Sequence, residues 1–234
     1  MPLLLGIETS TSRCSVALGD GDTVQELVDE RPREHHSLIL PMVQELLRSA
    51  GVSLRDLDAI AFGRGPGSFT GLRIAASITQ GLAFGAGLAV IPVSSLLALA
   101  ADADAQAGAA VGLDHVLVAT DAHMGGIYWG LYRRGAQGLC AVRDDALAHA
   151  EAFAAAQICA VPATILAGDA WRVYPQILPP GAPWLESAAP TAREVVRLAA
   201  RMQRSAWRSA EEAEPVYLRE ASVWKKIAEQ PAPF

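Results

Sequence analysis

Cysteine is scarce in this chain, and its scarcity excludes two kinds of site. Three cysteines occur among 234 residues, namely Cys14, Cys140 and Cys159, and no two of them have a C-x-x-C spacing. An odd number of distant cysteines indicates neither a disulfide framework nor a zinc site. The adjacent His35 and His36 cannot face one metal from the same helix, as an i, i+4 pair would. We therefore expect no metal site.

Positive charge is also in short supply. Lysine and arginine total 19 against 25 aspartates and glutamates, which gives a formal net charge of −6 at pH 7. Because phosphate contacts need a concentration of lysine and arginine, this balance argues against a free-standing nucleic-acid-binding protein. If RNA is involved, another subunit should supply most of the positive charge.

Long apolar runs are missing as well. No hydrophobic stretch reaches membrane-spanning length, and the short run Leu3 to Leu5 leads straight to Glu8, unlike a signal peptide. We expect a cytoplasmic protein with no membrane contact. The 234 residues, 51% of them hydrophobic, suffice for one large domain or two small ones.

Glycine, by contrast, is concentrated in the stretch Gly63 to Arg73, where four glycines and a proline fall within nine positions. A buried strand is predicted before it, over 59–62, and a helix after it, over 72–86. Such a loop exposes backbone N–H groups that can hold an anion, or it lets another backbone segment pack closely. It matches neither a Walker loop, nor a dinucleotide fingerprint, nor a nucleophile elbow. The phosphate-binding and packing interpretations both stay open.

Hydroxyl groups follow the first predicted strand, in the run Glu8-Thr9-Ser10-Thr11-Ser12. This loop suits phosphate contact or simple turn formation, and it could face the glycine loop across a cleft. The candidate phosphate-loop residues are Glu8, Thr9, Ser10, Gly65, Gly67 and Ser68.

The order of the predicted elements repeats along the chain. The first hundred residues read βββαβαβα, with strands at 3–7, 14–18, 23–28, 59–62 and 88–93 and helices at 38–47, 72–86 and from Ser94 or Ser95 through Leu99. The alanine- and glycine-rich stretch 102–112 is the predicted boundary between domains 1–103 and 104–234. Beyond it, strands at 116–120, 127–132 and 139–143, a helix at 146–156, a strand at 164–166 and a helix from Thr191 to about Arg204 repeat the order.

Two of the predicted helices, 38–47 and 72–86, carry more apolar residues than a small domain needs. Small residues such as Gly81 and Ala83 on the second would let a partner helix approach closely. The candidate interface residues are Leu38, Met42, Leu72, Arg73, Ala75, Ala76, Ile78 and Thr79. The C-terminal tail places aromatic residues beside lysines, which suits a partner groove, RNA, or an anchor to its own domain; the candidate contacts are Tyr217, Trp224, Lys225 and Lys226.

Taken together, these stretches resemble the TsaB (YeaZ) family of the threonylcarbamoyladenosine tRNA-modification machinery. The similar stretches are Ile7 to Thr11, Cys14 to Leu18, Pro32 to His35, Leu40 to Val43, Gly63 to Arg73, Asp121 to Gly125, Tyr128 with Trp129, Ala213 to Arg219 and Trp224 to Lys226. The resemblance implies an α/β protein with two duplicated domains of the actin-like ATPase (ribonuclease H-like) fold, which agrees with the repeated order of elements.

The resemblance also implies a role as the non-catalytic partner of TsaD, a larger paralogue. TsaD transfers the threonylcarbamoyl group to the adenosine next to the anticodon in tRNAs that read codons beginning with A. Its H-x-x-x-H metal motif follows the strand after its own glycine segment, whereas Pro92 to Ala100 contain no histidine here. We expect no catalytic residues and no cofactor of its own, although ATP could act in the complex. The implied partners are TsaD, a TsaE-type ATPase, a second copy when alone, and tRNA indirectly.

Three functions are compatible with these features. The favoured one is a required scaffold subunit that binds and activates a TsaD-type transferase. The alternative is an autonomous ATP-binding kinase or ATPase of the same fold, for which Glu8 and Asp121 are the candidate magnesium carboxylates. A peptidase would need a base beside Ser68, and no histidine lies near it in the sequence.

Overall fold

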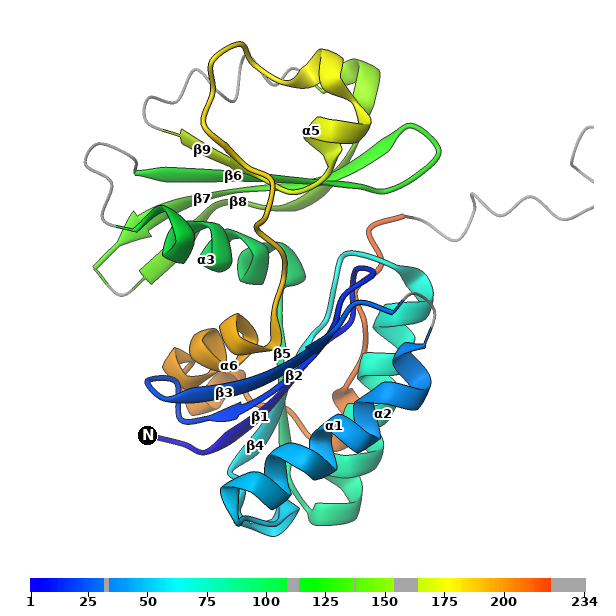
Figure 1. Cartoon of the computed structure of the whole chain (residues 1–234), viewed down its shortest axis with the longest axis vertical. Coiled ribbons are helices and arrows are strands. Elements are labelled where there is room, and N and C mark those ends of the chain that lie inside the picture. Colours follow the sequence, from blue (N-terminus) through cyan, green and yellow to red (C-terminus); the bar gives the residue numbers. More distant parts are fainter. Residues whose placement is uncertain (32–33, 109–113, 137, 154–163, 220–234) are drawn as a thin grey trace, which may run out of the picture.

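The computed structural model describes residues 1–31, 34–108, 114–136, 138–153 and 164–219. They form two α/β lobes stacked one above the other (Figure 1). The first lobe contains β1 (Leu4–Glu8), β2 (Cys14–Gly19), β3 (Val24–Asp29), α1 (His35–Ala50), η1 (Leu54–Asp56), β4 (Ala59–Gly63), α2 (Phe69–Ala86) and β5 (Ala89–Val93). The second contains α3 (Ser95–Ala107), β6 (His115–Asp121), β7 (Gly126–Gly135), β8 (Gly138–His149), η2 (Ala150–Ala152), β9 (Thr164–Ala167), α5 (Ala170–Val173), η3 (Pro175–Ile177) and β10 (Trp184–Leu185).

The two sheets have the same topology. The first has the strand order β3-β2-β1-β4-β5, and the second, taken from its other edge, has the order β8-β7-β6-β9-β10. In each, three antiparallel strands are followed by two strands that run parallel to the central one, β1 or β6. This confirms the predicted α/β fold and its internal duplication.

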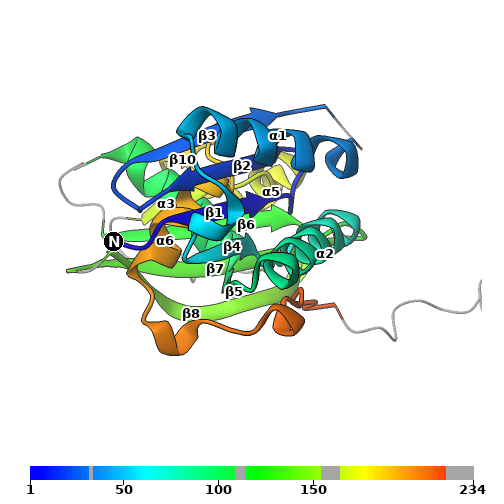
Figure 2. The same ribbon diagram turned by 90° about the horizontal axis from the view of Figure 1, so that it is seen from below.

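Helices cover both faces of the first sheet. Helices α1 and α2 lie on one face, and α6 (Ala192–Arg201) lies on the other (Figures 1 and 2). Val195 and Val196 of α6 pack among buried residues of β1, β2, β4 and β5. A Cβ atom at Gly6 would lie 2.7 Å from Cγ2 of Val196, so glycine permits this close approach. The chain therefore returns from the second lobe to complete the first, across the predicted boundary at residue 103.

Helix α3 joins the two lobes. Leu96, Leu99 and Ala103 pack on Val116 and on other buried residues of the second sheet, while α3 also contacts α6. The helix runs to Ala107, so the first six residues of the stretch 102–112 are helical, while the domain boundary placed there stays a prediction. Alanine favours helix, and the buried face at Ala103 supplies the packing that local composition did not reveal.

The predicted helix over 146–156 is wrong at its start. Residues 146–149 belong to β8, where Ala146 pairs with Trp129 and Ala148 pairs with Ile127 of β7. Pairing along β7 outweighs the helix propensity of alanine in this stretch. The end of the predicted helix, residues 154–156, lies outside the described residues, as do Trp224, Lys225 and Lys226.

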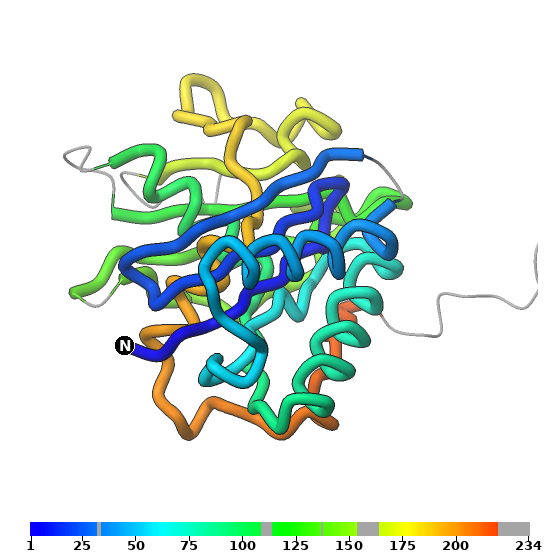
Figure 3. The backbone as a smooth tube through the Cα atoms, turned by 60° about the horizontal axis from the view of Figure 1, so that its bottom comes forward, coloured from blue at the N-terminus to red at the C-terminus, as the bar shows by residue number. Residues whose placement is uncertain are grey.

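After α6, the chain runs back along the first lobe through η4 (Arg204–Ala206) and η5 (Ala210–Glu212), and η5 packs beside α2 and β5 (Figure 3). Arg208 forms a backbone bridge with Val90 at the free edge of β5. The returning segment thus packs on the first lobe, whereas contacts of the tail with a partner or RNA stay predictions. None of the described helices has the length and apolar character needed to cross a bilayer.

Candidate functional site

Glu8 lies at the carboxyl end of β1 and is buried. Its Oε1 accepts a 2.6 Å hydrogen bond from the backbone N–H of Ser10, and its Oε2 accepts a 2.8 Å bond from the hydroxyl of Ser95. Burial raises the pKa of the Glu8 carboxyl, and these hydrogen bonds oppose the rise. A Cβ atom at Gly63 would lie 1.8 Å from Oε2, so glycine leaves the room that the carboxyl group occupies.

The glycine loop packs directly on the hydroxyl-bearing loop. The N–H of Ser68 donates a 2.7 Å bond to the carbonyl of Ser10, and the hydroxyl of Thr9 donates a 2.8 Å bond to the carbonyl of Gly71. Cβ atoms at Gly67 and Gly71 would lie 2.5 Å from the Ser10 oxygen and 1.9 Å from the Thr9 oxygen, respectively. The two predicted loops therefore come together, and glycine is required because their backbones touch.

Three backbone N–H groups of this loop, those of Arg64, Gly65 and Ser68, are already used within the chain. Arg64 donates to the carbonyl of Val93, and Gly65 donates to the Ser95 hydroxyl at 3.2 Å. The N–H of Ser68 is taken by Ser10, as described above, and the Ser68 hydroxyl caps α2. These contacts favour the packing interpretation of the glycine loop, while ATP binding stays a prediction.

Half of the candidate interface residues point inward. Leu72, Ala75, Ala76 and Thr79 are all at most 5% exposed. Ala75 and Ala76 belong to the core of the first lobe, and Ala76 also lines a groove beside the returning C-terminal segment. Their part in an interface stays a prediction, since a row of small residues also lets the chain's own segments approach closely.

The other candidates lie on an open helical face. Arg73 is exposed, and Leu38, Met42 and Ile78 are half-buried at the edge of the core. Next to them, an exposed row of small residues follows α2 at four-residue intervals, with open space above both glycines: Ser77, Gly81 and Gly85. The half-buried Ile74, Ile78 and Leu82 flank this row, and Phe84 is 71% exposed. We call the exposed and half-exposed surface of α1 and α2 the helical face.

Sequence reasoning missed Gly85 and Phe84 on this face. The spacing Gly81-x-x-x-Gly85 was the available signal, since residues four apart lie on one side of a helix. A small residue at every fourth position leaves a shallow track along a helix, into which the ridge of a second helix can pack.

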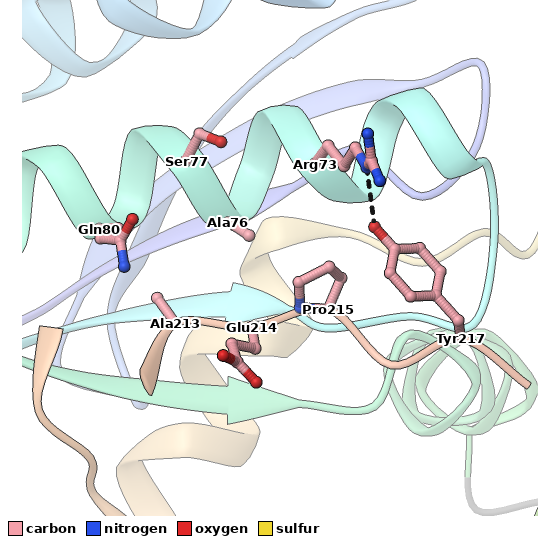
Figure 4. A pocket seen from close by; sticks show the side chains of 8 residues that line it. All are labelled: Arg73, Ala76, Ser77, Gln80, Ala213, Glu214, Pro215 and Tyr217. Carbon is pink, nitrogen blue, oxygen red and sulfur yellow. Dashed lines mark hydrogen bonds between the residues drawn. The ribbon is translucent and has the colours of Figure 1, made fainter. Parts of the chain in front are cut away.

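A groove of about 490 Å³ borders the helical face, between α2 and the returning segment (Figure 4). Its lining residues are Arg73, Ala76, Ser77, Gln80, Ala213, Glu214, Pro215 and Tyr217. Arg73 Nε donates a 3.2 Å bond to the Tyr217 hydroxyl, and its guanidinium lies 4.1 Å from the ring centre of Phe69. Phe69 and Tyr217 also contact each other, at 5.3 Å between ring centres. Tyr217 is thus a contact to this chain's own α2.

Comparisons with known proteins identify the family. A family model for TsaD, described as tRNA N6-adenosine threonylcarbamoyltransferase, matches residues 29–227. The tRNA threonylcarbamoyladenosine biosynthesis protein TsaB of Escherichia coli (strain K12) is 40% identical over 234 residues, which cover 96% of this chain and 97% of that protein. The chain belongs to the TsaB family.

Two further proteins support this membership. The TsaB protein of Haemophilus influenzae is 38% identical over 96% of both chains. The solved structure of YeaZ from Pseudomonas aeruginosa superposes with a TM-score of 0.82 at 37% identity, over 93% of this chain and 100% of that one. The resemblance read from the sequence and the actin-like ATPase type of fold are therefore confirmed.

In this TsaB-family chain, a polar network occupies the place where the resemblance puts the H-x-x-x-H metal motif of TsaD. Ser94 and Ser95 stand at the start of α3. The Ser94 hydroxyl donates a 2.5 Å bond to Asp145, which also accepts one from the buried Tyr132 at 2.5 Å. Burial and the neighbouring Asp145 raise the pKa of Tyr132. The Ser95 hydroxyl donates to Glu8, so Ser95 connects the start of α3 to the end of β1, whereas Ser94 connects it to β8.

Proposed function

We propose that this chain is a non-catalytic scaffold subunit. It binds and activates a TsaD-type transferase, and so supports the formation of threonylcarbamoyladenosine next to the anticodon of tRNAs that read codons beginning with A. The observation that carries the proposal is the helical face, an apolar surface with a track of small residues whose two glycines, Gly81 and Gly85, have no described part of the chain above them. Membership of a family named for this biosynthesis supports the pathway.

A non-catalytic role is supported by what the polar groups do. Both oxygens of Glu8 accept hydrogen bonds from the chain itself, and the N–H groups of Arg64, Gly65 and Ser68 are used internally. A kinase or ATPase needs such groups free to hold phosphates and magnesium. With serines in place of histidines at the start of α3, no imidazole ligand stands there.

The same face would serve more than one association. A helical surface that accepts the matching helices of a TsaD-type paralogue can also accept a second copy of itself, since the two proteins share a fold. We therefore propose a homodimer in the absence of the transferase, which TsaD would displace. A TsaE-type ATPase and tRNA would join through the complex, because a chain with a net charge of −6 is poorly suited to hold RNA alone.

The decisive experiment measures threonine incorporation into unmodified tRNA by TsaC, TsaD and TsaE proteins, with and without this chain. We expect activity only when both this chain and TsaD are present, and none when this chain replaces TsaD. Full activity without the chain would refute the scaffold role, and activity without TsaD would show that the chain is catalytic.

The helical face is tested by adding a bulky charge to it. Ser77→Arg, in the track, should weaken TsaD binding at least about tenfold, because an unpaired charge would be buried in the contact. Ala105→Arg, at an exposed site of α3, is the matched control and should leave the affinity unchanged. Equal affinity for both variants in titration calorimetry would show that the interface lies elsewhere.

The kinase alternative is tested by titration calorimetry with Mg-ATP. We expect no binding heat from the isolated chain, and binding would make the kinase alternative the favoured function.

A further inference from the structure

Residues 214–219 run from the first lobe to the second, and we call this segment the clasp. At its first end, the N–H of Val216 donates a 2.7 Å bond to the carbonyl of Arg64 in the glycine loop. At its second end, Nη2 of Arg219 donates 3.0 Å bonds to the carbonyls of Ala122 and His123, between β6 and β7. One short segment is thus hydrogen-bonded to both lobes.

The second end rests on an unusual hairpin. His123 and Met124 have φ values of 60° and 51°, and Gly125 follows with 74°. Non-glycine residues pay a free-energy cost in this left-handed region, and such residues persist only where their surroundings hold them. The guanidinium of Arg219 binds the carbonyls on the first side of this turn, and the imidazole of His149 lies against Gly125.

The first end rests on the helical face. Tyr217 packs on Phe69 and accepts the hydrogen bond from Arg73, as described above, so the clasp is fixed to the exposed side of α2 two residues before Arg219. The β6–β7 hairpin and α2 are therefore both attached to the clasp, so a movement of either element would be transmitted to these six residues.

The duplication of the sheets gives this contact a counterpart. The β6–β7 hairpin stands in the second sheet where the β1–β2 loop stands in the first, each at the carboxyl end of the central strand. The glycine loop holds the first through Ser68 and Ser10, and Arg219 holds the second. In each lobe, the loop at this position is therefore hydrogen-bonded to another part of the same chain.

We propose that the clasp locks the two lobes together, with Arg219 as the positioning residue that keeps the β6–β7 hairpin in its left-handed conformation. The inference does not depend on the proposed function, and its test needs no transferase.

The test is amide hydrogen exchange in the full chain. Three amides report on the hairpin, since Ala122, Gly126 and Ala150 donate to Gly126, His123 and Gly125. Arg219→Ala should speed their exchange about three- to tenfold, as expected when charge-assisted hydrogen bonds to a local structure are lost. The Val216 amide should follow if the clasp acts as a unit. Unchanged exchange at the hairpin would overturn the proposal.

Two further variants separate this role from general destabilisation. A Cβ atom in Gly126→Ala would lie 2.7 Å from Nη2 of Arg219, so it should displace the guanidinium and reproduce the effect without altering Arg219. The double variant should then exchange no faster than either single one. Arg208→Ala is the matched control, because Arg208 also binds two carbonyls, those of Ser205 and Trp207, but only within its own segment. An equal effect of Arg208→Ala on the hairpin would refute the lock.

Discussion

At the scale of single residues, Glu8 is a buried carboxyl group held by neutral donors. Among the described residues, no cationic side chain forms an ion pair with it. Because burial raises its pKa above 4.5, the folded protein binds a proton at this site more readily than the unfolded chain does. Between 4.5 and the raised pKa, the free energy of unfolding therefore falls as the pH increases.

Glu8→Gln isolates this contribution. The amide of the variant can still accept the hydrogen bond of Ser10, but it carries no charge to bury. Wild type loses stability as the pH rises above about 4.5, and the variant should not show this loss. We expect the stability of the variant relative to wild type to increase between about pH 4.5 and pH 8 in chemical denaturation. Exposed carboxyls with lowered pKa values, such as Asp29 and Asp56, act oppositely but equally in both proteins. Parallel pH profiles would contradict this account.

At the scale of elements, α2 has one face that touches its own lobe and one that is open. Gly71 and Gly81 occupy the two faces. A Cβ atom at Gly71 would lie 1.9 Å from the Thr9 carbonyl, whereas at Gly81 it would meet nothing within 4 Å. The same substitution should therefore have opposite effects at the two positions.

We expect Gly71→Ala to destabilise the protein by about 2 kcal/mol or more, because the β1–β2 loop must move away from the helix. Gly81→Ala should stabilise it by about 0.5–1 kcal/mol, because alanine restricts the unfolded chain and favours helix. Midpoints of denaturant unfolding measure both. A destabilised Gly81→Ala would show that the helical face is covered in the isolated protein.

The elements themselves could largely be predicted from the sequence. Glycine-containing turns located β6 and β7, and apolar residues at helical intervals located α2, although this helix begins at Phe69 and not at Leu72. The prediction of a helix that starts at Ala146 is wrong, because this residue belongs to β8 and the helix preference of alanine carries no information about a neighbouring strand. The partner of α6 could not be predicted either, because amphipathicity reveals which face is buried but not which sheet covers it.

The candidate site could be predicted only in part, because a sequence pattern shows that a close contact exists but does not show what makes it. Glycine spacing showed that something must come close to Gly67 and Gly71, but a phosphate and the Ser10 carbonyl make the same demand on a side chain. The clasp was beyond prediction, since the contact of Arg219 with His123 joins residues 96 positions apart and involves backbone carbonyls, which carry no sequence signal.

At the scale of the whole molecule, the lobes are joined in three places: at α3, at the return into α6, and at the clasp. Such connections make the lobes interdependent. We expect one transition in differential scanning calorimetry, with equal calorimetric and van't Hoff enthalpies. Val196→Ala removes contacts between α6 and the first sheet. It should lower the free energy of unfolding by about 1–3 kcal/mol, and the protein should still unfold in one transition. Two resolved transitions would show instead that the lobes unfold independently.

The return of α6 also has a consequence during protein synthesis. The last strand of the first sheet ends at Val93, yet the helix that covers its second face begins at Ala192. At about 5–20 residues per second, roughly 5–20 s of translation separate the two. For that time the apolar side chains of Leu4, Ile91 and Val93 have no helix over them, so the nascent chain is exposed to aggregation until α6 has been synthesised.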